Sequence, residues 1–292
     1  MKRLIIIIVL FSAVSSQYVC AQEVPVHEFS AYTGFGLSSL RYQLLQGNRS
    51  GGFGGDIGVG YTWYRTNVRV TGTGRVFNER WGIFTGLGLG LYNAKSKLGK
   101  DEKINIENLI DSEGDRFNLR STLSKYKETN RAMYLNIPAM AQFQIERYYV
   151  LGGFKFGIPL GGKYKSKDAT LLNEASYPAF GNYWISSPKT EGLGHFSDKK
   201  SDSKLKYGVT VMLALEGGMN WYINRNFSLY SGVYFDIGLN NVSKNKHLPF
   251  VEFDYKAADI PSRFSTNSMM SAFSEKVNIM AVGVKARLAY VK

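Results

Sequence analysis

The stretch Trp81–Tyr92 reads WGIFTGLGLGLY, and it alternates residue by residue between two kinds of side chain. Large apolar residues such as Ile83 and Leu91 occupy every second position except Thr85, and glycines fill most of the positions between them. A period of two is typical of a β-strand, because successive side chains of a strand point to opposite faces of a sheet. The stretch therefore predicts a strand with one bulky apolar face and one nearly bare face.

The same alternation recurs in seven further segments. In Phe53–Tyr64, for example, Ile57 and Val59 share one face, and Asp56 and Gly58 share the other. Each segment is long enough to cross a hydrocarbon layer as a tilted strand, which takes about 9–11 residues. Pro138 removes a ladder donor from the fourth segment, and we expect a bulge or a strand-end kink there. The eight predicted strands are Glu28–Leu40, Phe53–Tyr64, Trp81–Tyr92, Arg131–Ile145, Tyr148–Leu160, Tyr207–Tyr222, Phe227–Asn240 and Lys276–Val291.

The connections between these strands mostly alternate between long and tight. The long, charged ones are Lys95–Asn130, Gly161–Lys206 and Asn241–Glu275, and Gly47–Gly51, Glu146-Arg147 and Asn224–Asn226 are short. The Arg65–Arg80 connection is longer than its place in the order predicts, and we read it as a hairpin with its tip at Thr71–Gly74. Tight turns at one end and long loops at the other are typical of an outer-membrane barrel, whose loops face the exterior. The predicted fold class is all-β: an eight-stranded antiparallel up-and-down transmembrane β-barrel with long extracellular loops.

On the predicted strands, charged residues and glycines lie on one face, and the large aliphatic residues lie on the other. A soluble barrel would bury its large apolar residues, so this inversion indicates lipid outside. A charge that faces the middle of a bilayer costs about 2–4 kcal/mol, so these charged side chains are expected to point inward. They form either a structural ion network in the lumen or a gate and conduction path. In the network, three acids balance three bases, and Lys155 and Arg287 are the suggested partners of Glu216. The residues are Asp56, Lys155, Glu216, Asp236, Lys285 and Arg287.

Aromatic residues cluster at the strand ends that carry the tight turns. An aromatic ring with one apolar and one wet edge suits the boundary between membrane and water. We therefore predict an interfacial girdle formed by Tyr61, Trp63, Trp81, Tyr148, Trp221, Tyr222 and Tyr290.

The N-terminal segment has the pattern of an export signal. Lys2 and Arg3 precede an apolar run, Leu4–Val14, that is too short to remain as a spanning helix. We predict cleavage after Ala21, which gives a signal peptide at 1–21 and a barrel domain at 22–292. The single cysteine, Cys20, then leaves with the leader, which excludes disulfides and thiolate chemistry in the mature chain. The alternative is a lipoprotein acylated at Cys20.

The formal net charge of +13 arises largely from lysines in the polar segments. Nucleic-acid binding is not expected of an exported chain, whereas attraction to surface sugars or lipopolysaccharide phosphates is compatible with the charge. We expect as partners the outer-membrane lipid and lipopolysaccharide, the barrel-assembly machinery, and an envelope or secretion-complex protein.

No motif predicts a catalytic, metal or cofactor site. The repeat Gly86–Gly90 lacks the helix that a dinucleotide loop needs, and glycines on one strand face leave room for bulky residues across a narrow lumen. His27, His195 and His247 have no metal-ligand spacing. A lipid A-modifying barrel enzyme is an open alternative, in which His195 or His247 would act with Ser197 or Ser243.

Several short motifs resemble one family of bacterial barrels. They are the leader end Ala21-Gln22, Asn78–Trp81 before a glycine-rich strand, Tyr134–Pro138, and Gly152–Tyr164, which reads GGFKFGIPLGGKY. With these motifs the chain resembles the small OmpA-like or PorT-like outer-membrane barrels of Gram-negative bacteria. The resemblance implies an eight-stranded barrel. The leading hypothesis is a non-catalytic barrel of the Gram-negative outer membrane with a structural or surface-interaction role through its long loops, and the alternatives are a narrow channel and the lipid A-modifying enzyme.

Overall fold

A computed structural model describes residues 24–45, 47–70, 76–99, 101–111, 113–167, 169–199, 202–244, 248–253 and 264–292. The predicted leader and its cleavage site lie outside these residues. None of the helices in the described ranges is both long enough and apolar enough to cross a membrane.

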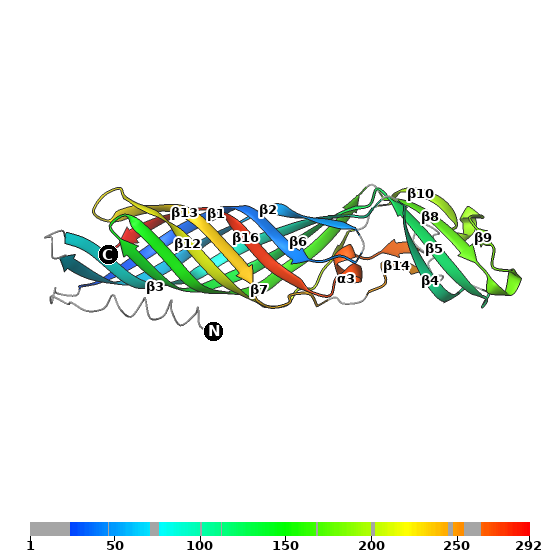
Figure 1. Cartoon of the computed structure of the whole chain (residues 1–292), viewed down its shortest axis with the longest axis horizontal. Coiled ribbons are helices and arrows are strands. Elements are labelled where there is room, and N and C mark those ends of the chain that lie inside the picture. The colour runs from blue at the N-terminus through cyan, green and yellow to red at the C-terminus, as the bar shows by residue number, and fades with distance from the viewer. Residues whose placement is uncertain are drawn as a thin grey trace, which may run out of the picture.

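Eight long strands close into an antiparallel ring (Figure 1). Each strand pairs with its neighbours in chain order, and the last strand pairs with the first. The prediction of an eight-stranded up-and-down barrel is therefore confirmed. The ring strands are β1 (Val24–Tyr42), β2 (Asn48–Val70), β3 (Val76–Lys97), β6 (Lys127–Ile145), β7 (Tyr148–Lys167), β12 (Thr210–Tyr222), β13 (Phe227–Gly238) and β16 (Val277–Val291).

Several ring strands run beyond their predicted ends. The strands β2 and β3 remain paired as far as Val70 and Val76, so the predicted hairpin is present, and its tip at 71–75 lies outside the described residues. The bulge expected at Pro138 is not observed. Pairing of β6 with β7 runs in register through Pro138, and the register shift lies between Met133 and Tyr134. The wall can absorb the missing donor because only the ladder to β3 is interrupted, next to Pro138.

The wall is apolar outside and polar or bare inside. Leu89 and Leu213 are 44% and 36% exposed on the outer face, where they would contact lipid. On the inner face, a Cβ at Gly88 would lie 2.3 Å from the hydroxyl oxygen of Tyr32, and a Cβ at Gly58 would lie 2.6 Å from the same ring. The inward glycines therefore make room for tyrosines that cross the lumen.

The three long connections are not irregular loops, because they fold into a cap beyond one end of the ring (Figure 1). One sheet of the cap contains β4 (Glu102–Ile110), β5 (Arg116–Ser124), β8 (Ala169–Ser176), β9 (Trp184–Ile185) and β10 (Gly194–Lys199). The remaining elements are η1 (Pro178–Phe180), η2 (Lys189–Glu191), β14 (Val251–Phe253), β15 (Phe264–Thr266) and the helix α3 (Met269–Phe273). The short strand β11 (Asp202–Lys204) instead pairs with the cap end of β7 in the ring.

The cap has its own hydrophobic core. It includes Leu119 and Leu123 from β5, Leu171 from β8, and Phe250 and Met269 from the last connection. Burial alternates along β5, so this strand follows the same period of two as the ring strands. Because all three connections supply core residues, they form one body.

Candidate functional site

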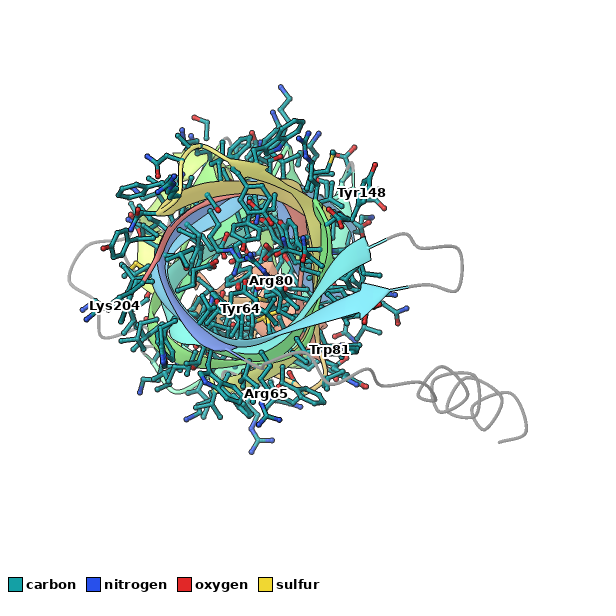
Figure 2. All side chains as sticks on the ribbon, turned by 90° about the vertical axis from the view of Figure 1, so that its left-hand side faces the viewer. Tyr64, Arg65, Arg80, Trp81, Tyr148 and Lys204 are labelled. Carbon is teal, nitrogen blue, oxygen red and sulfur yellow. The ribbon has the colours of Figure 1, made fainter. Side chains whose placement is uncertain are left out.

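Buried side chains fill the lumen from the end with the tight turns. Figure 2 looks into this end, where Tyr64 and Arg80 point into the ring and Trp81 and Tyr148 point away from it. The Arg287 guanidinium lies 4.1 Å from the ring centre of Tyr230 and donates to the Gln142 side chain at 3.0 Å. Glu28 accepts a hydrogen bond from the Tyr230 hydroxyl at 2.8 Å. This layer is a set of aromatic rings around one cation and one carboxylate.

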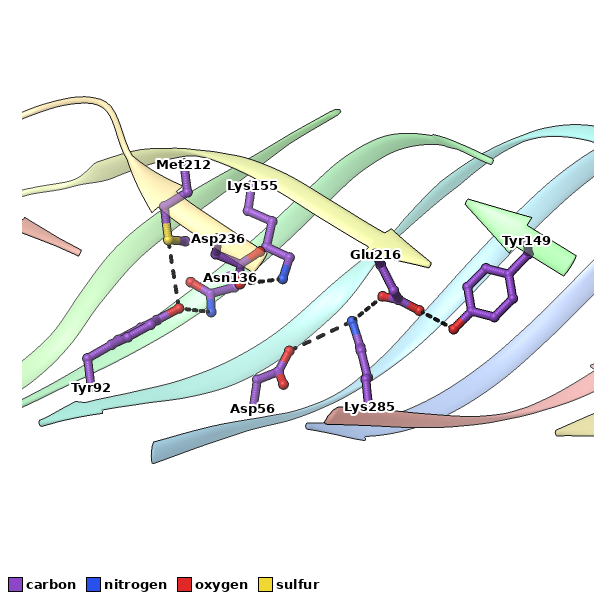
Figure 3. A network of polar contacts seen from close by, with 9 residues as sticks. All are labelled: Asp56, Tyr92, Asn136, Tyr149, Lys155, Met212, Glu216, Asp236 and Lys285. Carbon is purple, nitrogen blue, oxygen red and sulfur yellow. Dashed lines mark hydrogen bonds and ion pairs between the residues drawn. The ribbon is translucent and has the colours of Figure 1, made fainter. Parts of the chain in front are cut away.

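Two carboxylates meet one ammonium in the next layer (Figure 3). Lys285 Nζ lies 2.9 Å from Glu216 Oε2 and 3.9 Å from Asp56 Oδ2. Glu216 also accepts a hydrogen bond from Tyr149 at 3.0 Å. Lys285 further lies over the ring of Tyr32, 4.2 Å from its centre. Lys285 therefore contacts two carboxylates and one aromatic ring, and Tyr149 holds one of the carboxylates in place.

A second ion pair follows toward the cap. Lys155 Nζ lies 2.7 Å from Asp236 Oδ2, and both side chains are almost fully buried. Beside this pair, the Asn136 amide donates to the Tyr92 hydroxyl at 3.1 Å, and that hydroxyl faces the sulfur of Met212 (Figure 3). Polar contacts give way here to apolar ones.

The structure places all six predicted lumen charges on the inner face, but the suggested partners of Glu216 were wrong. Lys155 and Arg287 were the suggested partners, whereas Lys285 makes the direct ion pair with Glu216. The register of facing strands decides which side chains meet across the lumen, and the sequence does not give it.

Sequence reasoning also missed the buried carboxylate of Glu28. The sequence could have revealed it, because Glu28, Ser30 and Tyr32 occupy alternate positions of the first strand and therefore lie on the same face. Glu28 adds a fourth acid to Asp56, Glu216 and Asp236, which face Lys155, Lys285 and Arg287 in these layers, while Glu128 lies at the cap end of the lumen and Arg80 at its mouth. The predicted balance of three against three is therefore shifted by one acid.

The outer end of the lumen is closed by apolar and aromatic side chains. Met270 of α3 packs into this end, and the Tyr207 hydroxyl faces its sulfur at 3.9 Å. The Tyr134 hydroxyl donates to the carbonyl of Gly208 at 3.0 Å. Met269 of the same helix packs into the cap core instead, so α3 joins the two cores.

One buried carboxylate holds α3 in this position. Glu128 accepts hydrogen bonds from the Met269 backbone N–H at 2.8 Å, the Ser268 hydroxyl at 2.6 Å and the Asn130 amide at 2.7 Å. The Tyr126 hydroxyl donates to it at 2.9 Å. Burial, and then the charge of Glu128, raise the pKa of Tyr126, so this phenol keeps its proton and remains a donor. We call α3 with Glu128 the plug.

Six of the seven predicted girdle residues point outward near the tight-turn end. They are Tyr61, Trp63, Trp81, Tyr148, Trp221 and Tyr290. Tyr222 differs, because it has the parity of the inner face and its hydroxyl accepts a hydrogen bond from buried Gln144 at 3.1 Å. Arg80 lies over its ring, so Tyr222 closes the lumen mouth rather than joining the girdle.

Of the residues nominated for an enzyme, His195 and Ser197 lie on one strand and Ser243 lies elsewhere. His195 and Ser197 are exposed on β10 in the cap, whereas Ser243 lies at the barrel rim and is bridged to Tyr207. His247 lies outside the described residues. Within the described ranges, no group of three or more His, Cys, Asp or Glu residues could hold a metal ion.

Strand β9 lies at the end of the cap far from the ring (Figure 1), and large apolar side chains of η1 and β9 and of the residues between them are exposed. Phe180 and Tyr183 are 72% and 78% exposed. Trp184 is held in place by the guanidinium of Arg120, which lies 4.1 Å from the indole centre. Arg120 in turn pairs with Glu174 at 2.8 Å. We call Phe180, Tyr183, Trp184 and Ile185 the aromatic tip.

No protein-family model matches the chain, and no curated protein matches it in sequence. Among solved structures, it is similar to Ail, the attachment invasion locus protein of Yersinia pestis, in complex with the heparin analogue sucrose octasulfate. That match has 10% identity, a TM-score of 0.28, and covers 91% of this chain and 99% of Ail. Neisserial surface protein A matches with 11% identity, a TM-score of 0.27, and coverage of 91% and 98%.

Proposed function

We propose that this chain is an outer-membrane barrel of a Gram-negative bacterium that acts without catalysis, as a rigid support for an extracellular binding cap. The observation that carries the proposal is the cap itself, in which three connections share one core and present the aromatic tip. Ordering a backbone costs about 1–2 kcal/mol per residue, so loops that only join strands gain little from folding. A folded surface that ends in exposed aromatic residues suits binding.

The exterior of the ring supports the membrane placement. The outward aliphatic residues, such as Ile57, Leu89 and Leu213, form an apolar belt around the ring, and exposing this belt to water would be unfavourable. The outward aromatic residues lie at the edge of the belt that is nearer the tight turns. The finer assignment, a small barrel of the OmpA-like or PorT-like kind, is part of the proposal and is supported by Asn78–Trp81 and Gly152–Tyr164.

The contents of the lumen favour support over transport. Ion pairs and tyrosines occupy its length, and the plug packs into its outer end. An eight-stranded ring leaves an interior just wide enough for side chains to fill. A conduction path would require the plug and the tyrosine layers to move.

Adhesion by intact cells tests the binding role. Cells that make the full-length protein should adhere to one another or to an animal-cell layer more than cells without it. Phe180→Ser with Tyr183→Ser should abolish the gain, and the exposed cap substitution Lys103→Gln should not. Adhesion that is unchanged by the tip variant, or a steady open conductance of the wild type in planar bilayers, would contradict the proposal. An altered lipid A mass in producing cells would instead favour the enzyme alternative.

A further inference from the structure

Cations gather on the outward face of β3, β6 and β7 just beyond the apolar belt. Nine outward positions form three rungs of cross-strand neighbours, and seven of them hold Lys or Arg. We call these nine positions the basic array. From the belt outward, the rungs are Asn93, Arg131 and Lys163, then Lys95, Thr129 and Lys165, then Lys97, Lys127 and Lys167.

The array places like charges directly opposite one another. In the outermost rung, Lys97 pairs in register with Lys127, and Lys127 pairs in register with Lys167. Side chains opposite each other on adjacent strands have Cβ atoms about 4.5–5.5 Å apart, and like charges at this spacing repel. Asp202 offsets part of this charge, because it lies 3.1 Å from Lys165. A bound polyanion would relieve the repulsion that the rungs share.

The array lines an open hollow of about 580 Å³. All seven of its cations border this hollow, together with Thr129 and the exposed hydroxyl of Ser50. The hollow is also bordered by Glu128, but the carboxylate of that residue is buried and bonded to α3. The surface that a ligand meets is therefore rich in donors and cations.

An apolar surface continues from the array on the same three strands. One step below the innermost rung lie Leu91 on β3, Met133 on β6 and Leu160 on β7, and all three are exposed. The cations are sparser elsewhere, since at the corresponding ends of β1 and β16 the outward Arg41 lies next to Ser39 and opposite Asn278. A ligand that fits has an anionic head and an apolar body.

We propose that the basic array is a binding site for a phosphorylated glycolipid of the outer leaflet, with its phosphates on the array and its acyl chains on the belt. The inference rests on the membrane placement proposed above. Phosphate is the anion that lysine clusters recognise at membrane surfaces, and each cation near the surface strengthens such binding. A soluble polyanion would use the cations but leave the adjoining aliphatic residues without a role.

Lipid binding to the purified full-length protein tests the proposal. Native mass spectrometry in detergent would titrate bis-phosphorylated lipid A, the same lipid with its phosphates removed, and a sulfated oligosaccharide without acyl chains. The test variant is Lys97→Gln with Lys127→Gln and Lys167→Gln. The matched control removes three exposed lysines outside the array, Lys103→Gln with Lys125→Gln and Lys189→Gln. Heat-modifiable migration verifies the barrel in each sample.

We expect the test variant to bind bis-phosphorylated lipid A about 10- to 100-fold more weakly than wild type, and the control to match wild type. Removal of the phosphates should weaken binding to wild type similarly. Equal losses in both variants, or no dependence on phosphate, would overturn the proposal. Equally tight binding of the oligosaccharide would overturn it in favour of a soluble polyanion. If the outermost rung is needed for folding, Lys95→Gln with Lys165→Gln gives the same readout. Cell adhesion through the aromatic tip is measured in a separate assay, so the glycolipid site and the binding role of the cap can be refuted independently.

Discussion

The Nζ atom of Lys285 lies 2.9 Å from Oε2 of Glu216, and both side chains are almost completely buried inside the ring. Glu216→Ala would leave Lys285 with the longer contact to Asp56 at 3.9 Å and the ring of Tyr32. Breaking one member of a buried pair typically costs about 3–5 kcal/mol, because the remaining charge stays buried. We expect the urea midpoint of the refolded barrel to fall accordingly.

The exposed pair Lys165–Asp202 provides the control for this experiment, since its side chains are 53% and 55% exposed. Asp202→Ala should change stability by about 0–1 kcal/mol, because solvent screens an exposed pair. Equal midpoints for Glu216→Ala and wild type would show that lumen water, not the ion pair, solvates Glu216.

Gly88 and Tyr32 make a second prediction, about packing. A methyl group at Gly88 would meet the Tyr32 hydroxyl oxygen at 2.3 Å and the carbon that bears it at 3.2 Å. Gly88→Ala should therefore destabilise the barrel by about 1–3 kcal/mol. Tyr32→Phe in the same chain removes the hydroxyl and should restore most of the loss. If the double variant were as unstable as Gly88→Ala, the clash would not be with Tyr32.

A third prediction concerns the plug. Glu128→Ala removes the acceptor for the Met269 N–H and the Ser268 hydroxyl. Hydrogen bonds to a charged group contribute about 1.5–3 kcal/mol each, so the loss of these two should speed up amide exchange across α3 by at least about 100-fold. The ring strands should keep their protection. Glu113→Ala, an exposed acid of the cap, is the control, and unchanged exchange in α3 would mean that apolar packing alone holds the helix.

A fourth prediction uses the tryptophans, of which the chain has four. Trp63, Trp81 and Trp221 lie on the outer face of the ring, whereas Trp184 lies in the cap. In bilayers that contain brominated acyl chains, single-tryptophan variants that keep a ring tryptophan should be quenched. The variant that keeps Trp184 should not be. If the fluorescence of Trp184 were quenched and that of Trp63, Trp81 and Trp221 were not, the apolar belt would lie outside the bilayer.

The ring could be predicted from the sequence because a bilayer imposes a strict rule on it. Charged side chains are excluded from outward positions in the hydrocarbon layer, and aliphatic residues such as Ile57, Leu89 and Leu213 mark that face. The rule stops at the edge of the bilayer. Beyond Leu91 the outward residues become Asn93 and Lys95, and the predicted third strand ends at Tyr92 although β3 continues to Lys97.

The cap was missed for a related reason. Phe117, Leu119 and Leu123 alternate with polar residues in β5, but nine residues of alternation inside a charged segment are a weak signal. The lumen was predicted only as a set of charges. Which charges meet depends on the stagger of all eight strands, so the partner of Glu216 could not be obtained from alternation.

Surface labelling of single-cysteine variants tests the central claim, that the filled barrel holds its cap outside the cell. Tyr183→Cys places a thiol at the aromatic tip, and Glu146→Cys places one in a tight turn at the opposite end, where both native side chains are exposed. The parent chain, whose single cysteine is Cys20, gives the background. On intact cells, a membrane-impermeant maleimide should label Tyr183→Cys, and it should reach Glu146→Cys only after the outer membrane is permeabilised. Labelling of Glu146→Cys with protection of Tyr183→Cys would reverse the orientation and contradict a cap that binds partners outside the cell.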